Sequence, residues 1–219
     1  MSTYKLDYQK KWDYENGFYL TCETGRIGKI LNHLEIYRKI TTIPGDILEF
    51  GVYKGTSLMR LFAFRELLEN EASRRIIGFD AFGSFPKDIS LDSDLAFVDM
   101  FEEVGGDGIS LEDLTRCIEF KNYRNYELVK GNINETLPKW IKDHPEKRFS
   151  LIHIDVDVYE PTKTILEHAY NKLLPGGILM LDDYGTVEGE TRAVDEFFKG
   201  NYKFQKPSYY HIPSYIVKE

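Results

Sequence analysis

Short apolar runs alternate with amphipathic stretches along most of the chain. The runs are bounded by turn residues and are mostly rich in branched or aromatic side chains, which predicts buried strands. The predicted strands are residues 46–50, 76–79, 126–130, 149–154 and 177–181. Apolar positions at helical spacing predict helices at residues 27–40, 58–70, 135–143, 161–174 and 192–199. Strands that alternate with helices indicate an α/β fold with a mostly parallel sheet.

Two parts of the chain depart from this alternation. Two short strands are predicted within residues 202–206 and 211–217, and they would add an antiparallel edge to the sheet. Residues 84–122 are rich in acidic side chains and glycines, and a connection of this length is usually functional. We therefore predict a lid at 84–122. With 219 residues, of which 42% are hydrophobic, the chain is expected to form a single domain over 1–219.

The composition narrows the class of partner and the compartment. A formal net charge of -8 without a basic block argues against a nucleic-acid surface. Cys22 and Cys117 are the only cysteines, which fits a reducing compartment and argues against a disulfide framework. The sequence has no recognisable signal peptide and no apolar run of membrane-spanning length. We expect a cytoplasmic protein without nucleic-acid or membrane partners, and the sequence leaves a homo-oligomer open.

Acidic residues follow two of the predicted strands. Asp155 comes directly after strand 149–154, and Asp182 and Asp183 come directly after strand 177–181. Because parallel strands end at the same edge of a sheet, these carboxylates should converge. Converging carboxylates repel one another unless a cation or a proton lies among them, and oxygen ligands suit Mg²⁺, Ca²⁺ or Mn²⁺. The sequence therefore predicts a metal-assisted site.

A glycine-containing turn follows the first predicted strand, over residues 49–57. Its glycines let the backbone approach a ligand, and its exposed amides favour an anionic or polar group, although a plain tight turn explains it equally well. Asp80 ends the next strand, where an acid can accept both ribose hydroxyls; a helix cap is the alternative. Together they favour an adenosine-type ligand. Gly55 follows Gly51 by four residues rather than two, which disfavours NAD.

Five sequence motifs occur in order between residues 49 and 185. They are Glu-Phe-Gly-Val-x-x-Gly-x-Ser at 49–57, Asp-x-Phe-Gly-x-x-Pro at 80–86, Gly-x-x-x-x-Thr-Leu-Pro at 131–138, Ile-Asp-x-Asp-x-Tyr at 154–159, and Pro-Gly-Gly followed by Asp-Asp-Tyr-Gly within 175–185. Together they resemble the macrocin-type (TylF/MycF-related) sugar O-methyltransferases, which are class I S-adenosylmethionine-dependent enzymes. The resemblance implies a Rossmann-like, doubly wound sheet of seven strands, S-adenosylmethionine as the donor, and Mg²⁺ or another divalent cation at the acceptor hydroxyl.

The resemblance also implies roles for individual residues. The methionine part of the donor would contact the glycine turn, and its ribose would contact Asp80 and the residues next to it. Its adenine would lie near the turn after residue 130, and an N-terminal helical cover formed by residues 1–40 would lie over the donor. The implied donor contacts are Glu49, Gly51, Tyr53, Gly55, Ser57, Asp80, Ala81, Phe82, Gly131, Asn132, Tyr19, Thr21, Arg26 and Asp155.

The acceptor half of the implied site consists of metal ligands, a base and two tyrosines. Asp155, Asp182 and Asp183 match the metal ligands of the family, and Asp155 is the predicted proton acceptor, with Asp157 or a water as alternatives. Related catechol enzymes place a lysine base three residues after the first metal aspartate, where this chain has valine. Tyr159 and Tyr184 are predicted to shape the acceptor pocket, although aromatic packing explains them equally well.

The acceptor is predicted to be a small molecule: a sugar, a glycosylated metabolite or a nucleotide-linked sugar, such as a precursor of a capsule or antigen polysaccharide. One alternative is a metal-dependent nucleotide-sugar glycosyltransferase that uses residues 155–157, Asp-Val-Asp, as a DxD motif. Another is a non-catalytic nucleotide-binding protein. His153 is expected to be a core histidine that points away from the aspartates.

Overall fold

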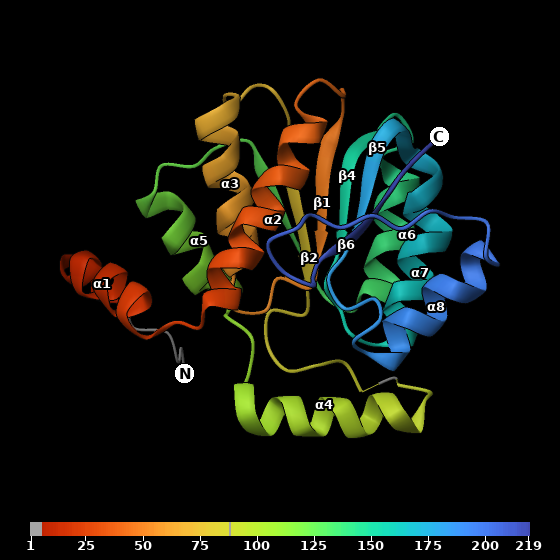
Figure 1. Cartoon of the computed structure of the whole chain (residues 1–219), viewed down its shortest axis with the longest axis horizontal. Helices are drawn as coiled ribbons and strands as arrows, with labels where there is room; N and C mark the ends of the chain where they lie inside the picture. The colour runs from red at the N-terminus through yellow and green to blue at the C-terminus, as the bar shows by residue number, and fades with distance from the viewer. Residues whose placement is uncertain (1–5, 88) are drawn as a thin grey trace.

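A six-stranded sheet in the order β3-β2-β1-β4-β5-β6 forms the centre of the computed structural model, which describes residues 6–87 and 89–219 (Figure 1). Neighbouring strands from β3 to β5 pair in parallel, and β6 pairs with β5 antiparallel. The strands are β1 (Asp46–Phe50), β2 (Ile76–Asp80), β3 (Tyr126–Lys130), β4 (Phe149–Ile154), β5 (Leu173–Leu181) and β6 (Ser214–Val217).

The register of the central strands brings their carboxyl ends level. Phe50 is the partner of Ile154 across β1 and β4, and Ile154 is the partner of Leu181 across β4 and β5. The order of the strands reverses between β1 and β4, and open α/β sheets bind their ligands at such a switch point. The residues that follow these three strands are therefore neighbours in space.

Helices cover both faces of the sheet because each strand turns successive side chains to opposite sides. One core cluster joins apolar side chains of α2, α3 and α5 to one face, and a second joins α6, α7 and α8 to the other (Figure 1). The helices are η1 (Tyr8–Lys10), α1 (Lys11–Thr21), α2 (Thr24–Ile40), α3 (Thr56–Leu68), α4 (Asp92–Gly105), α5 (Leu111–Phe120), α6 (Ile133–Asp143), α7 (Tyr159–Ala169), η2 (Tyr170–Lys172) and α8 (Glu188–Phe198).

The expected strand within residues 202–206 is wrong, so the described residues form six strands instead of seven. Gln205 and Tyr215 form an isolated antiparallel bridge, with reciprocal backbone hydrogen bonds of 2.9 and 2.8 Å. Pro207 follows closely and has no N–H to extend the ladder. The antiparallel edge itself is confirmed, because β6 supplies it.

In the described part of the chain, the predicted lid contains α4 and α5, and the predicted N-terminal cover contains η1, α1 and α2. Helix α4 lies along the carboxyl edge of the sheet, whereas α5 belongs to the core on the side of α3 (Figure 1). Helix α2 packs on the sheet, but α1 buries none of its residues. Residues 1–5 of the predicted cover and residue 88 of the predicted lid lie outside the described residues. In the described ranges, no helix has both the length and the apolar character needed to cross a membrane.

Candidate active site

A cavity of about 560 Å³ lies between α4 and the carboxyl ends of β1, β2, β4 and β5. This volume lies in the range of small-molecule sites. The cavity brings most of the predicted site together. Of the residues predicted from the sequence, those that line it are Arg26, Gly51, Tyr53, Ser57, Asp80, Ala81, Gly131, Asp155, Asp182 and Asp183.

The glycine turn after β1 presses directly against the end of β4. Gly51 has a φ of +85°, and a Cβ at this position would lie 1.7 Å from the backbone oxygen of Asp155. The two strand ends are held together there because the Asp155 N–H donates to the Phe50 carbonyl at 2.9 Å. Glycine is therefore required at residue 51 both for its φ and for the space.

Asp80 orders the same turn through its carboxylate. Its Oδ2 accepts hydrogen bonds from the N–H groups of Val52 at 2.7 Å and Tyr53 at 3.0 Å. Its Oδ1 accepts one from the N–H of Phe82 at 2.5 Å. Burial raises the pKa of Asp80, although these three bonds oppose that shift. Asp80 thus shapes the loop where the donor is predicted to bind, and its predicted contact with the ribose stays a prediction.

Glu49 lies behind the cavity wall, fully buried, and its Oε1 accepts a hydrogen bond from the Ser57 hydroxyl. Its Oε2 has no hydrogen-bond partner among the described residues. Burial raises the pKa of Glu49 to about 8. Ionising this buried carboxyl group therefore costs free energy, and the hydrogen bond from Ser57 offsets only part of that cost.

Glu49→Gln is expected to raise the free energy of unfolding of the ligand-free protein more at about pH 9 than at about pH 5. An ordinary glutamate, as in the unfolded chain, has a pKa of 4.5, and the folded value is about 8. Burial of Glu49 therefore costs no stability below the unfolded-state pKa of 4.5. The free energy of unfolding then falls as the pH rises through the folded-state pKa of about 8. The gain from glutamine should reach a few kcal/mol, on the order of the shift at ~1.4 kcal/mol per unit. Urea unfolding at both pH values measures it.

The matched control is Glu167→Gln, on an exposed position of α7, which should leave the pH dependence of unfolding unchanged. A Glu49→Gln protein with the same pH dependence as the wild type would show that Glu49 ionises without cost in the fold.

Acidic side chains converge between β4 and β5. One oxygen each from Asp155, Asp182 and Asp183 lies within 4.8 Å of the others. Burial and the neighbouring Asp182 raise the pKa of Asp155 well above its usual range, and burial and Asp157 do the same for Asp183. Glu190, fully buried, accepts a hydrogen bond from the Asp183 N–H at 3.1 Å. The surrounding side chains supply too little positive charge to keep all of these carboxylates ionised. A hard divalent cation would supply it, and carboxylate oxygens suit such a cation.

Lys29 is the basic group that the sequence reasoning missed. It projects from α2, lines the cavity and forms an ion pair with Oδ2 of Asp182. Burial lowers its pKa, but Asp155 and Asp182 more than reverse this, so the pKa of Lys29 is raised. The available signal was helical spacing, since Arg26, Lys29 and His33 share one face of α2.

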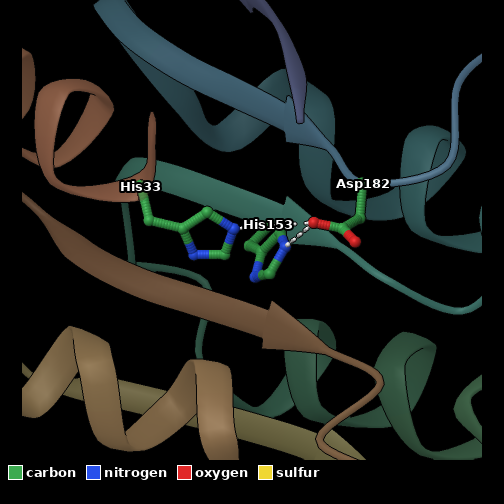
Figure 2. A group of neighbouring side chains, drawn as sticks. All are labelled: His33, His153 and Asp182. Atoms are coloured by element: carbon green, nitrogen blue, oxygen red, sulfur yellow. Dashed lines mark ion pairs between the residues drawn. The ribbon is translucent and has the colours of Figure 1, made fainter. Parts of the chain in front are cut away.

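Two buried histidines contact the other oxygen of Asp182 (Figure 2). The Nε2 atoms of His33 and His153 lie 3.6 and 3.5 Å from Asp182 Oδ1. Burial alone would raise the pKa of Asp182, but the contacts with both histidines and Lys29 hold it well below its usual range. The expected orientation of His153 is wrong: it precedes Asp155 by two residues, so strand alternation turns both toward the same side.

Several predicted residues lie outside the cavity lining. Tyr159 donates from its hydroxyl to Glu196 at 2.5 Å, and Tyr184 donates to Asp195 at 2.9 Å, so both hydroxyls face α8. The structure thus favours the packing alternative for both tyrosines. The other predicted residues that do not line the cavity are Tyr19 and Thr21 on the exposed helix α1, and Glu49, Gly55, Phe82 and Asn132 next to the cavity wall.

Helix α4, which belongs to the predicted lid, is attached at both ends. At its start, Asp94 Oδ2 accepts a hydrogen bond from the N–H of Tyr159, the first residue of α7, at 2.7 Å. At its end, the Gly105 carbonyl accepts one from the Tyr53 hydroxyl at 2.7 Å. Phe101, between these ends, lines the cavity and contacts the Tyr53 ring with centroids 5.0 Å apart. Helix α4 therefore connects the glycine turn to the start of α7.

Residues 24–209 match the protein family described as macrocin-O-methyltransferase (TylF). A curated relative from Streptomyces olivaceus, 8-demethyl-8-(2,3-dimethoxy-alpha-L-rhamnosyl)-tetracenomycin-C 4'-O-methyltransferase, is 30% identical over 171 residues, which are 75% of this chain and 62% of the relative. Mycinamicin III 3''-O-methyltransferase from Micromonospora griseorubida is 31% identical over 160 residues, which are 71% of this chain and 61% of the relative. The chain spans about three fifths of the length of these curated relatives.

Two solved structures have a similar fold. The apo structure of CalS11, described as a TDP-rhamnose 3'-O-methyltransferase of calicheamicin biosynthesis, has a TM-score of 0.70 and 26% identity, and the match covers 98% of this chain and 88% of CalS11. The O-methyltransferase NovP has a TM-score of 0.72 and 20% identity, and the match covers 88% of this chain and 80% of NovP. These matches confirm the predicted Rossmann-like α/β fold.

Proposed function

Because the chain belongs to the macrocin-O-methyltransferase (TylF) family, we propose that it transfers a methyl group from S-adenosylmethionine to a sugar hydroxyl. One observation supports this most directly: the glycine turn after β1 and the acidic cluster after β4 and β5 line the same cavity. A donor on the turn and an acceptor at the acids would meet there. The glycosyltransferase alternative leaves both the glycine turn and Asp182 and Asp183 without a role, and the family match favours methyl transfer.

The glycine turn and Asp80 would hold the donor. Methyl transfer from a sulfonium is an in-line displacement, so the protein has to align the acceptor oxygen, the methyl carbon and the sulfur, and to exclude water. Asp80 fixes the turn through three backbone N–H groups. Phe85 and Phe101, from the lid, line the same cavity with their rings in edge contact, 5.8 Å apart. They would limit the entry of water over the reacting atoms.

The acidic cluster would hold a divalent cation, for which Mg²⁺ is the expected species. The raised pKa values of Asp155 and Asp183 fit this role, because a cation relieves the repulsion that raises them. Asp155, Asp182 and Asp183 would be the ligands, and the cation would supply Lewis-acid activation and orientation of the acceptor hydroxyl. Asp155 would accept the hydroxyl proton, with Asp157, whose pKa burial and Asp155 raise to about 7, as the alternative base.

The proposed acceptor is the sugar of a glycosylated metabolite or of a nucleotide-linked sugar. The activities named for the relatives support this class, since they refer to a rhamnosyl-tetracenomycin, mycinamicin III and, for CalS11, TDP-rhamnose. A precursor of a capsule or antigen polysaccharide falls within the same class.

Calorimetry with S-adenosylmethionine and S-adenosylhomocysteine, followed by mass spectrometry of a panel of nucleotide sugars and glycosides, tests this function. We expect both donor forms to bind and one acceptor to gain a methyl group. Repeating the assay after chelation and after return of Mg²⁺ tests the metal separately. Failure of both donor forms to bind would exclude methyl transfer, whereas turnover that survives chelation would exclude only the metal.

A further inference from the structure

Asp182 differs from the other acids of the cluster in that basic side chains contact both of its oxygens. Lys29 contacts Oδ2 from the cavity side, and the Nε2 atoms of His33 and His153 lie 3.6 and 3.5 Å from Oδ1 on the buried side (Figure 2). The side chains of both histidines are 0% exposed, and that of Asp182 is 3% exposed. The carboxylate is therefore held between the ammonium group of Lys29 at the cavity and two buried rings in the core.

The two histidines come from different layers of the fold. His33 lies on α2, and His153 lies on β4, with the rings edge to face at 5.4 Å between centroids and an interplanar angle of 82°. Within the described residues, the ion-pair contacts of both histidines go to Asp182, apart from that of His153 Nδ1 with Glu49 Oε1 at 3.9 Å. His153 thus lies between the acid behind the donor turn and an acid of the acceptor half.

We infer that His33 and His153 are positioning residues that fix the orientation of the Asp182 carboxylate and so prepare it to bind the divalent cation. The inference rests on the metal role proposed above. Two rings against one oxygen limit rotation of the carboxylate, so less order is lost when the cation binds. Neighbours of this kind typically change metal affinity by about 10–100-fold when they are removed. On this inference, the ammonium group of Lys29 would leave Oδ2 when the cation binds.

A separate metal site made by the two histidines and Asp182 is the competing explanation, because their ligand atoms lie within 4.8 Å of one another. The geometry argues against it. The two rings are 0% exposed and do not line the cavity from which a cation would enter. A cation held by them would also share the Asp182 carboxylate with the cation proposed for the acidic cluster, and the two would repel each other.

Glutamine and asparagine variants of His33 and His153 test the inference. The two amide side chains are both polar, but only glutamine is long enough to bring an N–H near the position of the ring Nε2. The variants are His33→Gln, His33→Asn, His153→Gln and His153→Asn, and the probe is Mn²⁺ binding by calorimetry in the presence of S-adenosylhomocysteine. We expect each asparagine variant to bind Mn²⁺ about 10–100-fold more weakly than the wild type. Each glutamine variant should recover most of this loss, and the affinity for S-adenosylhomocysteine should be unchanged in all four.

His144→Asn is the matched control. His144 packs its ring on Trp140 with centroids 4.3 Å apart, and its Nδ1 lies 2.8 Å from the Trp140 carbonyl, outside the lining of the cavity. It should leave Mn²⁺ affinity unchanged. Equal Mn²⁺ affinity in the asparagine variants and the wild type would overturn the positioning role alone. The same conclusion would follow if the wild-type protein held tightly bound zinc that was lost when either histidine was replaced. A wild type that binds S-adenosylhomocysteine but no Mn²⁺ would overturn the metal role and this inference, but not methyl transfer.

Discussion

Asp182→Asn should reduce methyl transfer by roughly a hundred- to thousand-fold while leaving the affinity for S-adenosylhomocysteine within about two-fold. The substitution keeps the size of the side chain and removes one negative charge from the acid that Lys29, His33 and His153 contact. An amide is a poorer ligand for a hard divalent cation than a carboxylate. Steady-state kinetics with the acceptor identified by mass spectrometry, and calorimetry with S-adenosylhomocysteine, separate the two effects.

Asp195→Asn is the control for this experiment. Asp195 is an exposed acid on α8 that accepts hydrogen bonds from Tyr184 and Tyr202, outside the lining of the cavity. It should retain full activity. If Asp182→Asn also retained full activity, the acids after β5 would have no part in the reaction and the proposed metal site would be wrong.

Gly51→Ala is expected to destabilise the fold by more than about 4 kcal/mol, a loss that few single substitutions cause. The new Cβ would lie 1.7 Å from the Asp155 backbone oxygen. A flexible side chain could move aside, but the obstacle is backbone that the bond from Asp155 N–H to Phe50 ties to β1. The end of β1 must separate from β4, which also disrupts the predicted donor turn. Urea unfolding and S-adenosylhomocysteine calorimetry measure the two losses.

Gly200→Ala separates the steric clash from the backbone strain. Gly200 has a φ of +77°, close to that of Gly51, but a Cβ added there would have no described atom within 4 Å beyond its chain neighbours. Alanine there should cost only the strain of a left-handed residue, about 1–2 kcal/mol. Similar losses in the two variants would mean that the close approach of β1 and β4 does not restrict residue 51.

The strand ends were predictable because they depend on local pattern. An apolar run predicts a buried strand, parallel strands share an edge, and the residue after each run is placed there by geometry. Asp155 and Asp182 could therefore be predicted as neighbours although 27 positions separate them. The count of seven strands was wrong because residues 202–206 have strand-like side chains but pair at one residue, Gln205.

Lys29 and His33 could not be predicted in the same way. Their place in the site depends on how α2 docks on the sheet, which is set by packing of Ile36, Tyr37 and Ile40 into the core and not by any motif near the acids. The prediction for Tyr159 and Tyr184 was wrong for the opposite reason. Both residues are close in sequence to the predicted metal ligands, but their hydroxyls donate to acids of α8. Proximity in sequence to a site residue therefore does not place a side chain in the site.

The attachment of α4 at both ends has a consequence for how the protein could diversify. Asp94 fixes the start of the helix to α7, and the Gly105 carbonyl fixes its end to Tyr53. Substitutions along the intervening turns, where Leu95 and Met100 are already exposed, should leave both anchors in place. Asp94 and Gly189 should instead vary together, because a Cβ at residue 189 would lie 2.8 Å or less from both carboxylate oxygens of Asp94. We expect related sequences that keep both Asp94 and Gly189 to keep the same arrangement of site residues, even where the exposed positions of α4 differ.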